Sequence, residues 1–433
     1  MSSGPVTSPP HSEAVVEPVS PQERIETLDI LRGWAVFGII LADVDILFKI
    51  TPGTDHVLNE LHKVFVVGKF WPLFSFLFGL GFAMQISRAE SRGHDFLALY
   101  RRRLLALLLF GLANALLLLH VWRGDILHRY ALWGFLLLLF RRRCPGALLL
   151  AAALCLLIPR VYDAVMDGRH LLRLGNPQTA AQAVREEAQR EATSRAWDSE
   201  FERTRRQGGY LALMKLRAKW LVVNFSSFRF YLHQLQFPFA LFLIGLYAGR
   251  RQIFENLPAN LPLVHQVMWW GLGLGLVGQL VWLVCEKLPN PAWPYFTRQV
   301  GSLAEPFADA ALSFFYATAV VLLAQHPGWK KFLAPLAAPG RMALTNYLLQ
   351  SVAFAILCPR YALGLFEQVR PAQAWGTAGM IFGLQLMLSL WWLGRFRFGP
   401  AEWLWRTLTY GKLQPMRIGQ PDRISPKGNN RAD

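Results

Sequence analysis

The sequence predicts an all-α membrane protein with about ten transmembrane helices and both termini in the cytoplasm. Of the 433 residues, 53% are hydrophobic and 13% are aromatic, which is more than an average soluble domain contains. The apolar residues form blocks near the length that crosses a bilayer, and clusters of basic residues separate these blocks. Together, these observations place the chain among polytopic membrane proteins.

Each apolar block is expected to form one helical span. The two shortest blocks are separated by Cys144-Pro145-Gly146, which favours two short or tilted helices joined by a tight turn. The spans are predicted at 28–48, 64–86, 104–120, 126–140, 145–161, 232–249, 264–285, 303–324, 342–366 and 372–394.

The basic residues predict the orientation of these spans. An even number of spans puts every basic cluster on one side, which the positive-inside rule assigns to the cytoplasm. One span more or fewer would put the later clusters on the opposite side. The clusters are Arg88 with Arg92, Arg101 to Arg103, Arg141 to Arg143, Arg250 with Arg251, Lys330 with Lys331, and the basic residues from Arg395 to Arg417.

The chain is expected to divide into five parts. Residues 1–23 and 418–433 are predicted to be disordered cytoplasmic tails. Two transmembrane bundles are expected at 24–161 and 232–417. Between them, residues 162–231 are predicted to lie outside the membrane, with an amphipathic helix near residues 184–196 and an aromatic interfacial end. This segment either covers the bundle as a solvated hairpin or controls access of a substrate.

Composition excludes several other classes of protein. The net charge of +17 does not predict nucleic-acid binding, because the basic residues lie between apolar spans. The four cysteines and the ten histidines lack the spacing of a disulfide framework or a metal site, and no metal is predicted. The glycines of 78–82 and 271–275 follow no predicted strand, so they predict close helix packing instead of a nucleotide loop.

The first span carries charged residues at a depth where charge is costly, which makes them candidates for a functional site. Arg32 and Asp43 are eleven residues apart. This spacing is about three helical turns, so both lie on one face, about 16 Å apart along the axis. Arg32 also has a simpler interpretation, in which it sets orientation and pairs with Asp29.

Polar residues of other spans are expected in the outer half of the bundle. Lys69 begins the second span, and Asp125 faces His128 at a helical spacing of three. Glu305 and Asp309 share one helix face, where two carboxylates repel, so an opposing cation, a metal or a shared proton is expected. Together they predict a polar extracytoplasmic cavity. The alternative is a hydrogen-bonded network that only holds the helices together.

Five motifs spread over both ends of the membrane domain resemble one known family. They are Leu28–Gly33 with Gly38–Leu41, Gly68–Phe70 with Leu73–Gly79, Gly124–Leu127 with Tyr130–Leu132, Gly340–Gln350, and Phe398–Arg406 with Thr409–Gly411. Together they resemble the signature of the YeiB-like family of bacterial inner-membrane proteins, a domain of unknown function.

The resemblance implies a fold similar to transmembrane acyltransferases, which pass acyl groups from cytoplasmic acyl-CoA to acceptors at the outer face. Those enzymes have an arginine, ten residues and then a histidine on the first helix. Arg32 and Asp43 occupy these two positions here, whereas YeiB-like relatives usually have asparagine at the second. The substrate-binding candidates are therefore Asp29, Arg32, Lys69, Glu305, Asp309 and Asn346, and the catalytic candidates are Asp43, Asp125 and His128.

The leading hypothesis is an acyltransferase of the bacterial inner membrane. Arg32 would hold a phosphate of acyl-CoA, and Asp43, with Asp125 or His128, would activate a hydroxyl or amine of a small molecule or an envelope glycan. The competing hypotheses are a transporter whose carboxylates relay protons and an envelope factor without catalysis. The sequence shows no internal repeat, which favours an enzyme over a transporter.

Reporter fusions test the predicted topology. Fusions after Arg103, Arg143, Arg251 and Lys331 and at the C-terminus should report a cytoplasmic location, and fusions within 170–210 an outside location. A cytoplasmic signal from 170–210 would contradict the ten-span arrangement.

Overall fold

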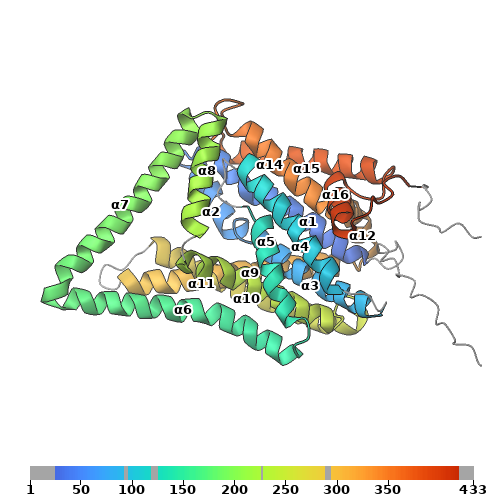
Figure 1. Ribbon diagram of the computed structural model, residues 1–433, viewed down its shortest axis with the longest axis horizontal. Coiled ribbons are helices and arrows are strands. Elements are labelled where there is room, and N and C mark those ends of the chain that lie inside the picture. Colours follow the sequence, from blue (N-terminus) through green and yellow to red (C-terminus); the bar gives the residue numbers. More distant parts are fainter. Residues whose placement is uncertain (1–24, 92–95, 119–124, 226–227, 288–293, 419–433) are drawn as a thin grey trace, which may run out of the picture.

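The computed structural model describes residues 25–91, 96–118, 125–225, 228–287 and 294–418. Within these ranges the regular structure is helical apart from two isolated β-bridges, so the predicted all-α class is confirmed (Figure 1). The predicted tails, apart from Ile418, lie outside the described residues.

The first half of the chain contains helices of the bundle, followed by α6 and α7, which meet at a sharp corner beside it (Figure 1). They are α1 (Glu26–Asp43), η2 (Val44–Leu47), α2 (Thr54–Phe65), α3 (Phe70–Ser91), α4 (Phe96–Ala113), the π-helical η3 (Asn114–Leu118), α5 (Leu127–Leu137), η5 (Leu138–Phe140), α6 (Pro145–Gly175) and α7 (Pro177–Gln207).

The remaining helices return to the bundle and complete it. They are α8 (Tyr210–Phe225), α9 (Phe228–Arg250), α10 (Leu257–Lys287), α11 (Pro294–Leu323), α12 (Pro327–Leu333), η6 (Ala334–Leu336), α13 (Ala337–Arg341), α14 (Ala343–Leu357), α15 (Pro371–Leu393) and α16 (Pro400–Tyr410).

Several helices have the length and composition of membrane spans. Five stretches are long and apolar enough to cross a bilayer, and two further apolar helices are shorter. This supports a protein with several spans, while the count of ten and its orientation stay predictions. The long stretches are Thr54–Glu90, Pro145–Gly175, Leu257–Lys287, Gln299–Leu323 and Pro371–Leu393, and the short ones are Leu127–Phe140 and Ala343–Leu357.

Helix α6 is longer than the predicted span 145–161. It continues to Gly175. Asn176 then caps α7, since its side chain accepts a hydrogen bond from the backbone N–H of Gln178 at 3.0 Å. The predicted amphipathic helix near 184–196 lies within α7. Figure 1 shows α6 and α7 projecting beside the bundle and meeting at a sharp corner. Near this corner Arg173 donates hydrogen bonds to Glu186, which lower the pKa of that carboxyl.

Helix α14 is shorter than the predicted span 342–366. It ends at Leu357, and Pro359 follows, since proline and the residue before it are poorly suited to continue a helix. The loop then runs beside the segment after α1. Val369 donates its backbone N–H to Leu47 O at 2.9 Å, and Lys49 donates to Val369 O at 2.7 Å. These bonds pair backbone groups of this loop with those of the segment after α1.

Glycines let several helices approach one another backbone to backbone. A Cβ at Gly340 would lie 1.9 Å from Asp29 O, and one at Gly33 would lie 1.9 Å from Leu336 O. Helices α1 and α13 therefore cross with no room for a side chain between them. The glycines at 79 and 271 meet the backbones of α9 and α11 in the same way, which confirms the predicted packing role of both glycine-rich runs.

Three of the family-like motifs meet at this crossing. Glu402 of α16 accepts hydrogen bonds from the backbone N–H groups of Leu344 and Thr345 at 2.7 and 3.0 Å, at the start of α14. Burial raises the pKa of the Glu402 carboxyl, and the hydrogen bonds from Thr345 act in the opposite direction. The carboxylate thus joins the last helix to the segment that packs on α1.

Gly340→Ala tests the crossing of α1 and α13. The new methyl group would overlap Asp29 O, so we expect a loss of about 1–3 kcal/mol or more in the free energy of unfolding, seen as a lower Tm in detergent. Gly273→Ala is the matched control, because a Cβ there has no atom within 4 Å. An equal Tm for the two variants would show that α1 and α13 are not tightly held together.

Candidate functional site

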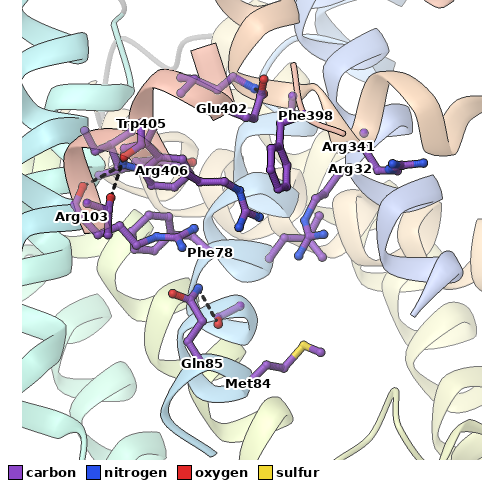
Figure 2. A pocket seen from close by; sticks show the side chains of 18 of the residues that line it. Arg32, Phe78, Met84, Gln85, Arg103, Arg341, Phe398, Glu402, Trp405 and Arg406 are labelled. Atoms are coloured by element: carbon purple, nitrogen blue, oxygen red, sulfur yellow. Dashed lines mark hydrogen bonds between the residues drawn. The ribbon is translucent and has the colours of Figure 1, made fainter. Parts of the chain in front are cut away.

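A cavity of about 410 Å³ lies between α1, α3, α4, α5, α14 and α16. Its mouth is basic and its inner walls are largely apolar and aromatic. Figure 2 shows Arg32 and Arg406 reaching into this space from α1 and α16, with Phe398 beside them. The cavity therefore combines a region for an anionic group with a region for an apolar one.

Arginine supplies the cationic side chains of the cavity. Two carboxylates also line it, and both are engaged. Asp29 accepts a hydrogen bond from Arg32 at 2.7 Å, as the simpler interpretation of Arg32 predicted, and Glu402 is held at the start of α14. Six guanidinium groups against two engaged carboxylates give the cavity a positive charge. The arginines are Arg32, Arg88, Arg103, Arg341, Arg397 and Arg406.

Aromatic rings fix two of these guanidinium groups. The Arg103 guanidinium lies 4.0 Å from the centre of the Trp405 ring, and that of Arg406 lies 4.5 Å from the centre of the Phe398 ring. The Trp405 indole also donates a hydrogen bond to Arg103 O at 2.9 Å. The charges at the mouth are thus held in place before any ligand arrives.

Two tyrosines stand on the inner wall. Tyr130 donates its hydroxyl to Trp71 O at 3.0 Å and lies 2.7 Å from the Ser75 hydroxyl. The Tyr347 hydroxyl donates to Asp125 Oδ1 at 3.2 Å and accepts from the backbone N–H of Ile126 at 3.4 Å. Tyr347 therefore joins the wall of the cavity to the buried group behind it.

That buried group is centred on Asp125, which is 0% exposed. Its Oδ2 lies 2.5 Å from His128 Nδ1 and accepts from the His128 backbone N–H at 3.1 Å, and its Oδ1 accepts from Asn114 at 2.9 Å. The contact between Asp125 and His128 expected from their spacing is confirmed. The pair is buried within the bundle.

A second polar group surrounds Lys69. Its ammonium contacts Asp309 Oδ1 at 2.8 Å and donates to the carbonyls of Lys63 and Val67, each at 2.7 Å. Gly68 has a φ of +85°, and a Cβ there would lie 2.0 Å from Asp309 Oδ2. The cation expected opposite the carboxylates of Glu305 and Asp309 is therefore present, and it is Lys69.

The remaining predicted site residues lie in separate places. Glu305 is close enough to Lys69 to interact electrostatically. Asp43 ends α1 half-buried, within electrostatic range of Tyr347, and does not line the cavity. Asn346 is buried between helices and donates to Pro339 O at 3.3 Å and to Ser389 at 3.0 Å. The structure thus brings together Asp29 with Arg32, Asp125 with His128, and Lys69 with its carboxylates.

Several residues of the cavity were missed at the level of sequence. Tyr347 stands within the motif Gly340–Gln350 but carries no charge to mark it. Trp405 and Arg406 lie in the C-terminal motif, whose basic residues were interpreted only as orientation signals. The helical spacing of Glu402, Trp405, Arg406 and Thr409, which puts them on one face, was the available signal.

The first part of the chain matches an acetyltransferase domain. Residues 24–184 match the model described as "Heparan-alpha-glucosaminide N-acetyltransferase, catalytic". Residues 248–412 match "Protein of unknown function (DUF418)". The cavity takes its walls from both regions.

Curated relatives match along nearly the whole chain. The "Uncharacterized protein YxaH" of Bacillus subtilis is 32% identical over 420 residues, covering 93% of this chain and 98% of the relative. The chain belongs to the YeiB/YxaH-like family. The "Uncharacterized protein YeiB" of Escherichia coli is a more distant member of this family, 29% identical over 91% of this chain and 98% of its own. No solved structure matches the chain.

For this member of the YeiB/YxaH-like family, substitutions at Asp125 separate a charged site from a packing network. Asp125→Leu removes the acceptor of three buried donors, so we expect it to lose at least about 1–3 kcal/mol of stability. Asp125→Asn keeps the volume and one acceptor oxygen but places an amide NH2 opposite donors on the other side, so it should lose clearly less stability than Asp125→Leu. Equal losses of Tm in both variants would favour the packing interpretation.

Proposed function

We propose that this protein is a membrane acyltransferase that takes an acyl-CoA-type donor into the arginine-lined cavity and transfers the acyl group to an acceptor beyond it. The observation that carries the proposal is the continuity of the cavity. Its mouth is lined by arginines, and its inner wall ends at Tyr347, which is hydrogen-bonded to the Asp125–His128 pair. The match to an acetyltransferase catalytic domain supports the same chemistry.

The two regions of the cavity suit the two parts of such a donor. Guanidinium groups bind phosphates through paired hydrogen bonds, and six of them line the cavity. The inner wall, with Phe74, Phe78 and Leu127, suits the acyl group and the thioester at the end of the donor's arm. A volume of about 410 Å³ holds part of a long donor, whose remainder would extend out through the mouth.

The residues behind the inner wall suit the activation of an acceptor. Asp125 beside His128 Nδ1 holds the imidazole ring in place, the arrangement in which a histidine acts as a general base. The acceptor O–H or N–H would give its proton to the base, its oxygen or nitrogen would bond to the acyl carbon, and the carbon–sulfur bond would break to release the CoA thiolate, which then takes up a proton. Asp43, near Tyr347, is the second group proposed to act on the acceptor.

The basic clusters give this reaction a direction. By the positive-inside rule, the mouth with Arg32, Arg103 and Arg341 faces the cytoplasm, where acyl-CoA is made. We propose the inner membrane of a bacterium as the location, since the curated relatives come from bacteria. The acceptor would be a small molecule or an envelope glycan on the outer side.

A transporter is the second candidate, because Lys69 and Asp309 form an ion pair buried within the bundle. Buried charge pairs can relay protons in transporters. In this chain, however, Lys69 directs its three hydrogen bonds to Asp309, Lys63 O and Val67 O. An ammonium group whose three N–H groups are all hydrogen-bonded supports a structural ion pair more than a proton relay. Acyl transfer therefore remains the preferred function.

The two ends of α1 should separate donor binding from transfer. Arg32→Ala removes a guanidinium group proposed to donate hydrogen bonds to a phosphate of the ligand. We therefore expect acetyl-CoA to bind about 10- to 100-fold more weakly. Asp43→Asn and Asp125→Asn should keep acetyl-CoA binding and lose about 10²-fold or more in the rate of transfer. Binding is measured by calorimetry on purified protein, and transfer by release of the CoA thiol in membrane vesicles that contain native acceptors.

Gly81 offers a variant that blocks the cavity without changing its charge. A Cβ there meets only the ends of the Arg32 and Gln85 side chains, both at 4.0 Å, so Gly81→Leu should fill the space and abolish binding. Gly273→Leu, on an open face of α10, is its control. Unchanged acetyl-CoA binding in Gly81→Leu would contradict a donor site in the cavity, and unchanged transfer in Asp43→Asn would remove Asp43 from the reaction.

A further inference from the structure

One face of α16 lines the cavity. Four of its residues at helical spacing belong to the lining, together with Phe398 just before the helix. Figure 2 shows Glu402, Trp405 and Arg406 along this wall. The residues of the face are Glu402, Trp405, Arg406 and Thr409, and Tyr410 extends it.

This surface alternates aromatic rings with guanidinium groups. Arg103 stacks over Trp405 and Arg406 over Phe398, so two planar cations and two planar rings stand at one mouth. The binding of phosphate groups alone would require only the guanidinium groups. Aromatic rings beside arginine are the chemistry that binds a nucleobase, because every base has a face that stacks on a ring or on a guanidinium plane.

The surface is held in place by hydrogen bonds to neighbouring segments. Glu402 fixes the start of α16 to α14, and the Trp405 indole is bonded to Arg103 O on α4. On the opposite side of α16, the Trp403 indole donates to Gln414 O at 2.8 Å. A ligand at this surface would therefore meet rings and charges that are already in place, which lowers the entropic cost of binding.

We propose that this surface of α16, with Arg103 and Phe398, binds the adenine nucleotide portion of the acyl-CoA-type donor. The inference rests on the proposed function, and it assigns donor recognition to the C-terminal helix, outside the segment that matches the acetyltransferase domain. The base stacks at the Trp405 ring, and the phosphates lie between Arg103 and Arg406. The acyl-bearing arm then runs inward along α3 toward Tyr347.

Three probes divide the donor into its parts. CoA contains the nucleotide and the arm, adenosine 3′,5′-diphosphate contains only the nucleotide, and 4′-phosphopantetheine contains only the arm. Calorimetry on the full chain in detergent should show binding of CoA and adenosine 3′,5′-diphosphate that weakens roughly tenfold in Trp405→Leu. Binding of 4′-phosphopantetheine should stay unchanged in that variant. Trp405→Phe keeps a stacking ring and should bind all probes nearly as the parent does.

Matched controls come from the same end of the chain. Arg395 lies 4.6 Å from the centre of the Trp391 ring, which reproduces the Arg–Trp pair outside the cavity. Arg395→Gln and Trp391→Leu should leave the binding of every probe unchanged, whereas Arg406→Gln should weaken CoA about tenfold. The Tm of each variant, measured in parallel, identifies any loss caused by unfolding, and Trp405→Phe then supplies the comparison with an intact fold.

The outcomes separate this inference from the proposed function. Tight CoA binding that Trp405→Leu and Arg406→Gln leave unchanged would overturn the nucleotide surface and keep the acyltransferase proposal. Binding of 4′-phosphopantetheine that falls as much as CoA in Trp405→Leu would also overturn it. Failure of the parent to bind either CoA or 4′-phosphopantetheine would count against both. Displacement of CoA by phosphatidylglycerol vesicles but not by adenosine 3′,5′-diphosphate would instead identify a lipid headgroup site.

Discussion

The architecture of this protein depends on the close approach of α1 and α13. Gly33 and Gly340 leave no room for a side chain where the two backbones cross. The approach places Arg32 beside the segment that begins α14, and Glu402 then brings α16 to the same place. Helices far apart in sequence thus enclose one cavity. The arginines that line this cavity lie together because these helices do.

Much of the fold could be predicted, because apolar length and basic clusters depend on local sequence. Each of the ten predicted ranges overlaps a helix among the described residues. The limits of α6 and α14 could not be predicted from hydropathy. Helix α6 extends into polar sequence until Asn176 caps the next helix, and α14 stops just before Pro359, after which the loop pairs with the segment after α1. Both limits coincide with a capping or helix-breaking residue, which a hydropathy window does not register.

The candidate site was likewise predictable from the sequence only in part. Helical spacing was enough to pair Asp125 with His128 and Arg32 with Asp29, since these contacts lie within one or two turns. It could not pair Lys69 with Asp309 as specific partners, although the need for a cation was predictable from charge. Nor could it find Tyr347, whose role depends on a contact between α14 and the start of α5. Contacts within a helix are thus readable from sequence, whereas contacts between helices require the fold.

The bond from Glu402 to α14 also bears on how the protein is made. The ribosome produces α1 early and α16 among the last described residues, yet both are walls of one cavity. Until α16 emerges, the first turn of α14 lacks the acceptor for its backbone N–H groups, and the arginines of the cavity lack their final wall. A nascent chain that stops before residue 400 would leave those charges without the wall that α16 forms. The cavity is therefore completed only when synthesis has reached α16.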